Sequence, residues 1–340
     1  MSNIDLLKKA VRERRMRSFD HVAKSTYKQA DMRLRKIKLA LGEMVTHGQN
    51  VAIFKPAKLN KLYGRKNLCL KVFTRSKTIW GERGVFGQST IAESTIVQNL
   101  MAIRGLAPRV YDLVKIDGKT AQVTDFLKKK GKRVKIEDDR FKFIQHEIVA
   151  PHNSRDGKLV DFQGAIFKDF HAVKKSLIDK AHTLTSFPRT TRRLYQTTDY
   201  CDGKRNTKAR LSRYKLPSFK GKTVFDIGCN LGMMMRAAHD RGALRVVGID
   251  WADMVEVSRE LAILDGYFNL DFVGGDLKKL TWEQIQALTG IKRFNAHFFF
   301  AMEMWIKWPG WVRDCDTLYY EGHGKVRPYE VFDNPAEAGK

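Results

Sequence analysis

The sequence has no run of about 18 or more consecutive apolar residues, which a membrane-spanning helix would need. Its N-terminal stretch, MSNIDLLKKAVRERR, has no apolar core of the kind found in a secretory signal. The four cysteines occur without a C-x-x-C motif or Cys/His pairing. Neither a disulfide framework nor a zinc site is therefore indicated. We expect a cytoplasmic protein without a metal site.

Acidic residues are scarce in the first two thirds of the chain. Residues 1–220 hold 49 Lys and Arg against 20 Asp and Glu, a net charge of +29, whereas residues 221–340 hold 14 against 17, a net of −3. A polyanion, such as nucleic acid, a phosphorylated glycan or anionic lipid headgroups, would therefore be bound by the first part. The alternative is a basic surface that only keeps the protein soluble.

The stretch from Lys222 to Asp250 has the pattern of a βαβ unit. It predicts a buried strand over Thr223–Ile227, a helix over Met233–Arg241 and a second strand over Arg245–Ile249. Two parallel strands joined through a helix are typical of an α/β fold with a nucleotide-type binding site at the carboxyl ends of the strands.

The turn between the first strand and the helix, in the string DIGCNLG, carries the binding signal. Gly228 and Gly232 tolerate positive φ and leave room for a ligand, and Asn230 is among the few other residues that adopt this conformation. Free N–H groups at the start of the helix suit an anionic group. Asp250 follows the second strand, where an acidic side chain accepts ribose hydroxyls.

The string DIGCNLG resembles motif I, D-x-G-x-G-x-G, of the class I methyltransferases that depend on S-adenosylmethionine (SAM), with Asn at the middle glycine. The dinucleotide pattern G-x-G-x-x-G is not matched. The resemblance covers residues 215–340 and implies a Rossmann-like domain with SAM as cofactor. Asp276 matches the position that accepts from the adenine 6-amino group, and a solvated turn aspartate is the alternative. The cofactor-binding residues that the resemblance implies are Asp226, Gly228, Cys229, Asn230, Gly232, Asp250 and Asp276.

Two further strands are predicted at Phe294–Trp305 and Thr317–His323. Their carboxyl ends bring Glu303 and His323 to the edge where α/β sheets place their chemistry, so each is a candidate general base. A structural histidine is the alternative for His323. The motif D/N-P-P-Y/F/W is absent, which argues against methylation of an exocyclic base amine. The seventeen residues after His323 are too few for the two last strands of the family fold, so we expect an exposed sheet edge. The connector, the kinase-like module or a second subunit in an oligomer would cover this edge, unless the domain is a decayed one.

The region before the methyltransferase-like part changes its pattern twice. Residues 3–47 predict a basic amphipathic helix that lies on phosphates, on a membrane surface or on the protein itself. Residues 51–127 predict short strands with one helix over 91–105 and a hairpin turning at Asp117-Gly118. Residues 183–220 form a basic connector in which arginines, Arg210 among them, alternate with tyrosines. This composition suits single-stranded nucleic acid, and it equally suits a segment that lies beside the cofactor site.

Residues 50–170 resemble a shortened N-lobe of the protein-kinase fold. Lys71 on a strand and Glu93 on the following helix match the pair that contacts ATP phosphates, and Asp161 in VDFQG matches the magnesium ligand of D-F-G, with Asn153 as a second ligand. A plain strand-to-helix ion pair is the alternative for Lys71 and Glu93. No glycine-rich loop precedes Lys71, and Ile148 stands at the base position, so phosphate transfer is not expected.

Four segments are therefore predicted. They are a basic helical arm (1–48), a kinase-like α+β module (49–182), the basic connector (183–220) and the methyltransferase domain (221–340), which is short at its C-terminus. The function that we predict is SAM-dependent methylation of a phosphate-bearing acceptor that the basic part recruits. A bifunctional kinase and methyltransferase that modifies a surface glycan is one alternative. A non-catalytic protein that binds nucleic acid is another.

Overall fold

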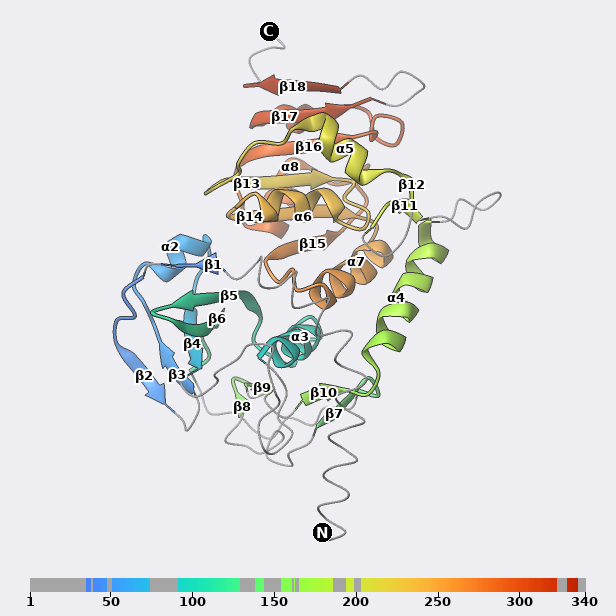
Figure 1. The fold of residues 1–340 in the computed structure, drawn as a ribbon. Helices are drawn as coiled ribbons and strands as arrows, with labels where there is room; N and C mark the ends of the chain where they lie inside the picture. Colours follow the sequence, from blue (N-terminus) through green and yellow to red (C-terminus); the bar gives the residue numbers. More distant parts are fainter. Residues whose placement is uncertain are drawn as a thin grey trace. The chain divides into compact units, whose positions relative to one another are not determined.

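The computed structural model divides the chain into two compact units (Figure 1). The first unit contains Met1–Lys175 and Ile263–Phe268, and the second contains Ser176–Ala262 and Asn269–Lys340. The residues that the structure describes are 35–37, 39–47, 51–73, 91–128, 138–143, 154–160, 162, 165–185, 194–198, 203–322 and 329–335. Within this part, no helix combines the length and the apolar character needed to cross a membrane.

The first unit is built on a six-stranded sheet in the order β1-β5-β6-β4-β3-β2. Apart from the short parallel pair of β1 and β5, its strands are antiparallel. Its elements are β1 (Arg35–Lys36), β2 (Met44–His47), β3 (Val51–Phe54), α2 (Leu59–Tyr63), β4 (Leu68–Phe73), α3 (Ile91–Ala102), β5 (Val110–Ile116) and β6 (Lys119–Asp125).

The β5–β6 hairpin turns where the sequence predicts it. Asp117 and Gly118 have φ of 48° and 75°, and two positive values at these positions suit the twist of a two-residue hairpin. The predicted strand containing Lys71 is β4, and the predicted helix with Glu93 is α3.

The predicted helix over residues 3–47 is wrong for its last part. Residues 35–36 and 44–47 form β1 and β2, and both join the sheet of the first unit. The loosely spaced apolar residues of this stretch fit a strand as well as a helix, and pairing with β3 and β5 decides between them. Residues 1–34 lie outside the described part.

Two small antiparallel pairs and a long helix follow in the first unit. β7 (Phe141–Phe143) pairs with β10 (Ala165–Phe167), and β8 (Ser154–Arg155) pairs with β9 (Lys158–Leu159). Helix α4 (Phe170–Thr185) continues into the second unit, where Leu177, Ile178, Ala181 and Leu184 pack on a cluster of Leu231, Met254, Val257 and Leu261.

The second unit is a Rossmann-like α/β domain. Its sheet has the order β15-β14-β13-β16-β17-β18, parallel except for the antiparallel β18. In Figure 1, α5 and α6 lie in front of this sheet. The elements are β11 (Leu194–Gln196), β12 (Gly203–Arg205), α5 (Thr207–Tyr214), β13 (Thr223–Ile227), α6 (Met233–Asp240), β14 (Arg245–Asp250), α7 (Ala252–Leu264), β15 (Leu270–Gly274), α8 (Trp282–Thr289), β16 (Phe294–Phe300), the 3-10 turn η3 (Gly310–Arg313), β17 (Cys315–Glu321) and β18 (Tyr329–Asp333).

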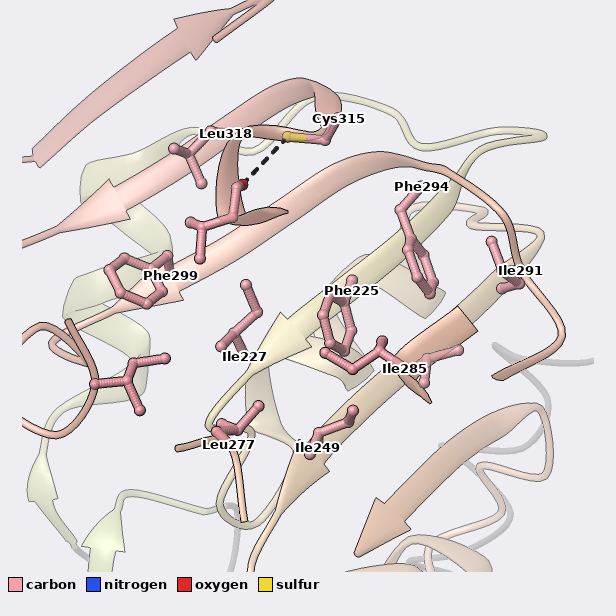
Figure 2. Close-up of a cluster of buried hydrophobic side chains, with 13 residues drawn as sticks. Phe225, Ile227, Ile249, Leu277, Ile285, Ile291, Phe294, Phe299, Cys315 and Leu318 are labelled. Carbon is pink, nitrogen blue, oxygen red and sulfur yellow. Dashed lines mark hydrogen bonds between the residues drawn. The ribbon is translucent and has the colours of Figure 1, made fainter. Parts of the chain in front are cut away.

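The core of the second unit buries Val224–Ile227 of β13. Phe225 and Ile227 point into an apolar cluster that Ile285 of α8 closes (Figure 2). The rings of Phe225 and Phe294 stack with centroids 4.9 Å apart. Because strand side chains alternate, Asp226 faces the opposite side of the sheet. Helix α8 begins with a capping box, in which Thr281 and Gln284 bond each other's backbone N–H.

The expectation of an uncovered edge beside β17 is wrong. Residues 329–333, counted as too few for a further strand, form β18 and pair with β17 from Thr317↔Asp333 to Glu321↔Tyr329. Among the described strands, β18 and β15 are now the outer ones. An oligomer through the edge of this sheet stays a prediction, and the edge is now that of β18, which carries the exposed Val331.

The basic connector does not stand apart from the methyltransferase-like domain. Its described residues include β11, β12 and α5, which lie within the second unit. Asn206 caps α5 by accepting a hydrogen bond from the Ala209 N–H, and Tyr214 at its end is buried between the rings of Phe300 and Tyr329. A linker composition therefore hides an ordered part of the domain.

Candidate functional site

The site is organised by the turn between β13 and α6. Gly228 and Gly232 have φ of 76° and 72°, and Asn230 has 48°. A side chain at Gly228 would overlap the sulfur of Met302, and one at Gly232 would lie 2.8 Å from the ring of Phe272. Both positions therefore require glycine, because the backbone has positive φ and because a Cβ would have no room. Both the predicted turn and its predicted residue types are confirmed.

Backbone and side-chain contacts fix this turn on the neighbouring strand. The N–H groups of Gly228 and Cys229 donate to the Ile249 carbonyl at 3.0 and 3.1 Å. The Ser258 hydroxyl donates to the Asn230 carbonyl at 2.8 Å. The fully buried Cys229 packs beside Gly248, and burial raises its thiol pKa well above the ordinary value. Cys229 therefore shapes the turn from the protein side.

Gln196 of β11 braces the turn from the other direction. Its Nε2 donates to the Cys229 carbonyl at 3.4 Å, and its Oε1 accepts from the Met233 N–H at 3.4 Å. The side chain is buried. Gln196 thus accepts a hydrogen bond from one of the N–H groups at the start of α6 that have no partner within the helix. Sequence reasoning missed Gln196, because a glutamine in a basic stretch without periodicity gives no signal.

Asp226 is a fully buried carboxylate whose Oδ2 has no hydrogen-bond partner within the described residues. Burial raises its pKa to about 7, the nearby guanidinium of Arg210 works against this rise, and the charge of Asp250 adds to it. The Oδ1 of Asn230 is likewise buried without a partner there. Two acceptor atoms beside the glycine turn are therefore left for a donor that the described part of the chain does not supply.

Arg210 reaches this side of the sheet from α5. Its Nε and Nη2 donate to the two carboxylate oxygens of Glu321 at 3.0 and 2.9 Å, and both side chains are buried. The guanidinium also lies over the Phe300 ring, 5.4 Å from its centroid. A buried bidentate pair of this kind fixes α5 to the end of β17. Arg210 is therefore unavailable to phosphates, which corrects its assignment to a nucleic-acid-binding connector.

Asp250 stands at the carboxyl end of β14, as predicted. Its Oδ2 accepts from the Asn230 N–H at 2.7 Å and its Oδ1 from the Trp251 N–H at 2.8 Å. Burial raises its pKa, and these two hydrogen bonds work against the rise. Each carboxylate oxygen has a second lone pair. Asp250 can therefore hold the turn and still accept hydroxyl groups.

Asp276 follows β15, whose last residue Gly274 pairs with Asp250. Its Oδ1 accepts from the Lys278 N–H at 3.0 Å, and its Oδ2 lies 3.8 Å from the Lys279 ammonium. Asp276 and Asp250 therefore occupy the same carboxyl edge on neighbouring strands, as the resemblance implies. The contacts of Asp276 also fit a turn aspartate.

Glu303 lies just beyond the carboxyl end of β16. The strand ends at Phe300, and the next residue, Ala301, has a φ of 56°, a strained value for a residue with a Cβ. Glu303 makes a side-chain hydrogen bond with Tyr320 of β17, and burial together with the Glu303 charge raises the pKa of that phenol. Glu303 is therefore at the predicted edge. His323, the other candidate base, lies outside the described residues.

In the first unit, Lys71 and Glu93 both bind the segment that contains Asp161. The Lys71 ammonium donates to the Val160 carbonyl at 3.1 Å, and a Glu93 oxygen accepts from the Phe167 N–H at 3.2 Å. Both side chains are buried. Asp161, Asn153 and Ile148 lie outside the described residues. Within the described part, no three His, Cys, Asp or Glu side chains gather as a metal site.

Comparison with known proteins gives partial matches. No protein-family model matches the chain. Among curated proteins, protein arginine N-methyltransferase 1 of Saccharomyces cerevisiae is 39% identical over 49 residues, which are 14% of each chain. This chain thus covers a small part of that relative's length.

Three solved structures illustrate the structural similarity. An S-adenosylmethionine-dependent methyltransferase from Mesorhizobium loti is 17% identical, with 38% of this chain and 65% of that chain covered and a TM-score of 0.28. The PRMT1 enzyme-prozyme complex of Trypanosoma brucei with AdoHcy is 24% identical, with 31% and 32% covered and a TM-score of 0.26. The bifunctional kinase-methyltransferase WbdD is 18% identical, with 44% and 35% covered and a TM-score of 0.32.

Proposed function

We propose that the second unit binds SAM and that the protein transfers its methyl group to an acceptor. The observation that supports this most is the pair of buried acceptor atoms, Oδ2 of Asp226 and Oδ1 of Asn230, beside a turn that requires glycine. A buried polar atom without a partner is costly, about 1 to 3 kcal/mol, and persists where a ligand supplies the partner.

The residues present fit the donors of SAM. An amino acid ammonium, two ribose hydroxyls and an adenine amino group all donate hydrogen bonds, and the site presents acceptors in Asp226, Asp250 and Asp276. When bound, SAM supplies an electrophilic methyl group on a sulfonium. Glu303 is then the group at the edge that accepts a proton from the acceptor, while its hydrogen bond with Tyr320 holds it in place.

The proposed acceptor bears phosphate and is recruited by the basic first part of the chain. The support is the net charge of +29 in residues 1–220. Electrostatic attraction of this size raises the encounter rate with a polyanion and weakens as salt is added.

Calorimetric titration with SAM tests the cofactor assignment. Loss of the Asp250 carboxylate removes charged hydrogen bonds to the ribose, so Asp250→Ala should weaken binding by ~30- to 150-fold. Asp253→Ala, an exposed carboxylate three residues further on, should bind like the wild type. Equal affinity of wild type and Asp250→Ala would contradict the assignment. No binding by any of the proteins would favour the non-catalytic alternative.

A second candidate function belongs to the first unit, which would bind a nucleotide or phosphate. The support is that Lys71 and Glu93 bind backbone groups of Val160 and Phe167, which come before and after Asp161 in the sequence. Incubation with labelled ATP, magnesium and phosphate acceptors should show no transfer, since Ile148 stands at the base position. Turnover that Asp161→Ala abolishes would overturn this and favour a bifunctional kinase and methyltransferase.

A further inference from the structure

A group of exposed apolar side chains follows β16 at the carboxyl edge of the sheet. Met304, Trp305 and Trp308 are 52%, 43% and 38% exposed. They lie within five residues of one another and directly follow Glu303. Exposed apolar side chains gathered in this way mark binding surfaces more often than isolated ones do. We call Met304, Trp305, Lys307, Trp308 and Arg313 the rim platform.

The rim platform is held in a fixed conformation. The N–H groups of Trp305 and Ile306 donate to the Met302 carbonyl at 2.8 and 2.9 Å, and Ile306 is buried in the apolar core. The Trp308 ring lies 5.0 Å from the Phe299 ring and 4.9 Å from the Tyr320 ring, measured between centroids. The exposed faces are therefore presented by an ordered segment, which lowers the entropic cost of binding.

The same segment is tied to the candidate cofactor turn. Met302, which carries the accepting carbonyl, packs directly against Gly228. Glu303 comes between Met302 and the platform, and Tyr320 contacts both Glu303 and Trp308. A molecule lying on the platform would therefore reach the group that we assign as the proton acceptor.

The charge of the rim platform indicates which kind of ligand it binds. Lys307 and Arg313 are exposed, and within the described residues neither is paired with a carboxylate. The Arg313 guanidinium lies 5.5 Å from the centre of the Trp308 ring. Two free cations among aromatic faces suit a ligand that combines planar rings with negative charge. They disfavour a basic peptide.

We propose that the rim platform binds single-stranded nucleic acid and that this nucleic acid is the methyl acceptor. The second part of the proposal rests on the proposed methyl-transfer function. Bases stack on Trp305 and Trp308, and phosphates are neutralised by Lys307 and Arg313. Stacking on aromatic side chains tolerates any base, so the platform recognises a flexible strand rather than one sequence. The net charge of +29 in residues 1–220 attracts a polyanion to the chain, whereas the cations of the platform itself are Lys307 and Arg313.

The test uses the full chain and a labelled oligouridylate that contains one 5-iodouridine. Trp305→Ala should weaken binding by ~5- to 150-fold, since one stacked base is lost, and Trp305→Phe should restore part of the affinity. Lys307→Ala should reduce the slope of log affinity against log salt by about 0.7. Irradiation should crosslink the iodouridine to residues 304–308.

Two control variants match these changes. Leu288→Ala removes an apolar side chain that is 55% exposed on α8, and Lys292→Ala removes an exposed lysine. Both should bind the oligonucleotide like the wild type. Wild-type affinity of Trp305→Ala, or crosslinks confined to the first unit, would overturn the proposal. So would Trp305-dependent binding of an arginine-rich peptide in place of the oligonucleotide.

The proposed function and the platform can fail separately. A protein that binds SAM but does not crosslink through residues 304–308 refutes the platform and leaves the cofactor site standing. A protein that crosslinks there but shows no SAM binding by calorimetry keeps the platform as a nucleic-acid site and refutes its role in methyl transfer.

Discussion

The glycine turn of the second unit and the Lys71 region of the first unit use buried polar side chains in different ways. At the turn, Oδ2 of Asp226 has no partner within the described residues. In the first unit, the Lys71 ammonium donates to the Val160 carbonyl of the same chain. Both residues match motifs of ligand-binding families, but Lys71 already has a partner within the chain, whereas Oδ2 of Asp226 has none within the described residues.

This difference shows what a motif residue can and cannot establish. A buried lysine on a strand is stabilised by any carbonyl that it meets, so its presence alone does not define a phosphate site. A buried carboxylate oxygen without a partner destabilises the protein that carries it. The turn is therefore the stronger candidate for a ligand site, and variants can be chosen that separate the two regions.

The largest effect is expected from breaking the ion pair of Arg210 and Glu321, which fixes α5 beside the turn. Glu321→Gln leaves a buried guanidinium without its counter-charge and should lower the unfolding free energy by about 3 to 5 kcal/mol. Denaturant unfolding measures this. The double variant Arg210→Met with Glu321→Leu should recover most of the loss, whereas the same loss in the double variant would contradict the pairing.

The exposed pair of Arg293 with Asp314 is the matched control for this experiment. Arg293→Met should change the unfolding free energy by less than about 1 kcal/mol, because solvent screens an exposed pair.

The next effect concerns the pH dependence of stability. The pKa of Asp226 is about 7 in the folded protein against an ordinary value of 3.8, so the fold keeps a proton that the unfolded chain has released. Its contribution to the unfolding free energy therefore falls as pH rises from 3.8 to about 7. The side chain of Asp226→Asn does not titrate, so this loss is absent from the variant. Its unfolding free energy should therefore rise relative to that of the wild type by on the order of 4 kcal/mol between pH 3.8 and about 7.

For His297, in the same unit, we expect the opposite pH dependence of stability. Burial lowers its pKa to about 4 from 6.5, against the rise caused by its hydrogen bond with the Val312 carbonyl. Its contribution to stability is present above pH 6.5 and is lost as pH falls toward 4. The difference between His297→Gln and wild type should therefore become more unfavourable as pH rises through this range. Differences that do not change with pH would refute both assignments.

A smaller effect is expected in the first unit. Lys71→Met removes the donor to the Val160 carbonyl and should lower the unfolding free energy by about 1 to 2 kcal/mol. Lys71→Arg, which keeps a cationic donor, should lose less. The SAM affinity of both variants, measured by calorimetry, should equal that of the wild type. A matching loss of SAM affinity would show that the two regions are not independent.

Local sequence signals predicted most of the second unit. The strand over Thr223–Ile227 and the glycine turn depend on neighbouring residues, and each lies where the pattern put it. The pattern also brought Asp226, Asp250 and Asp276 to one edge, since carboxyl ends of adjacent parallel strands meet there.

Contacts between residues far apart in the chain could not be predicted from the sequence. Arg210 and Glu321 are 111 residues apart, and Gln196 and Cys229 are 33 apart. The composition of the connector left two interpretations open, a nucleic-acid-binding segment and a segment beside the cofactor site. The strand Tyr329–Asp333 is short and is formed by pairing with β17. The prediction of a helix at residues 44–47 was wrong for the same reason, because pairing with β3 determines their conformation.

Amide hydrogen exchange with and without SAM tests the central claim most directly. If the turn binds the cofactor, SAM should slow the exchange of amides in Gly228–Met233 and leave those of Leu68–Phe73 in β4 unchanged. Binding to the folded state should add protection that grows with ligand concentration. Unchanged exchange in the turn, or protection confined to the strand of Lys71, would contradict the account.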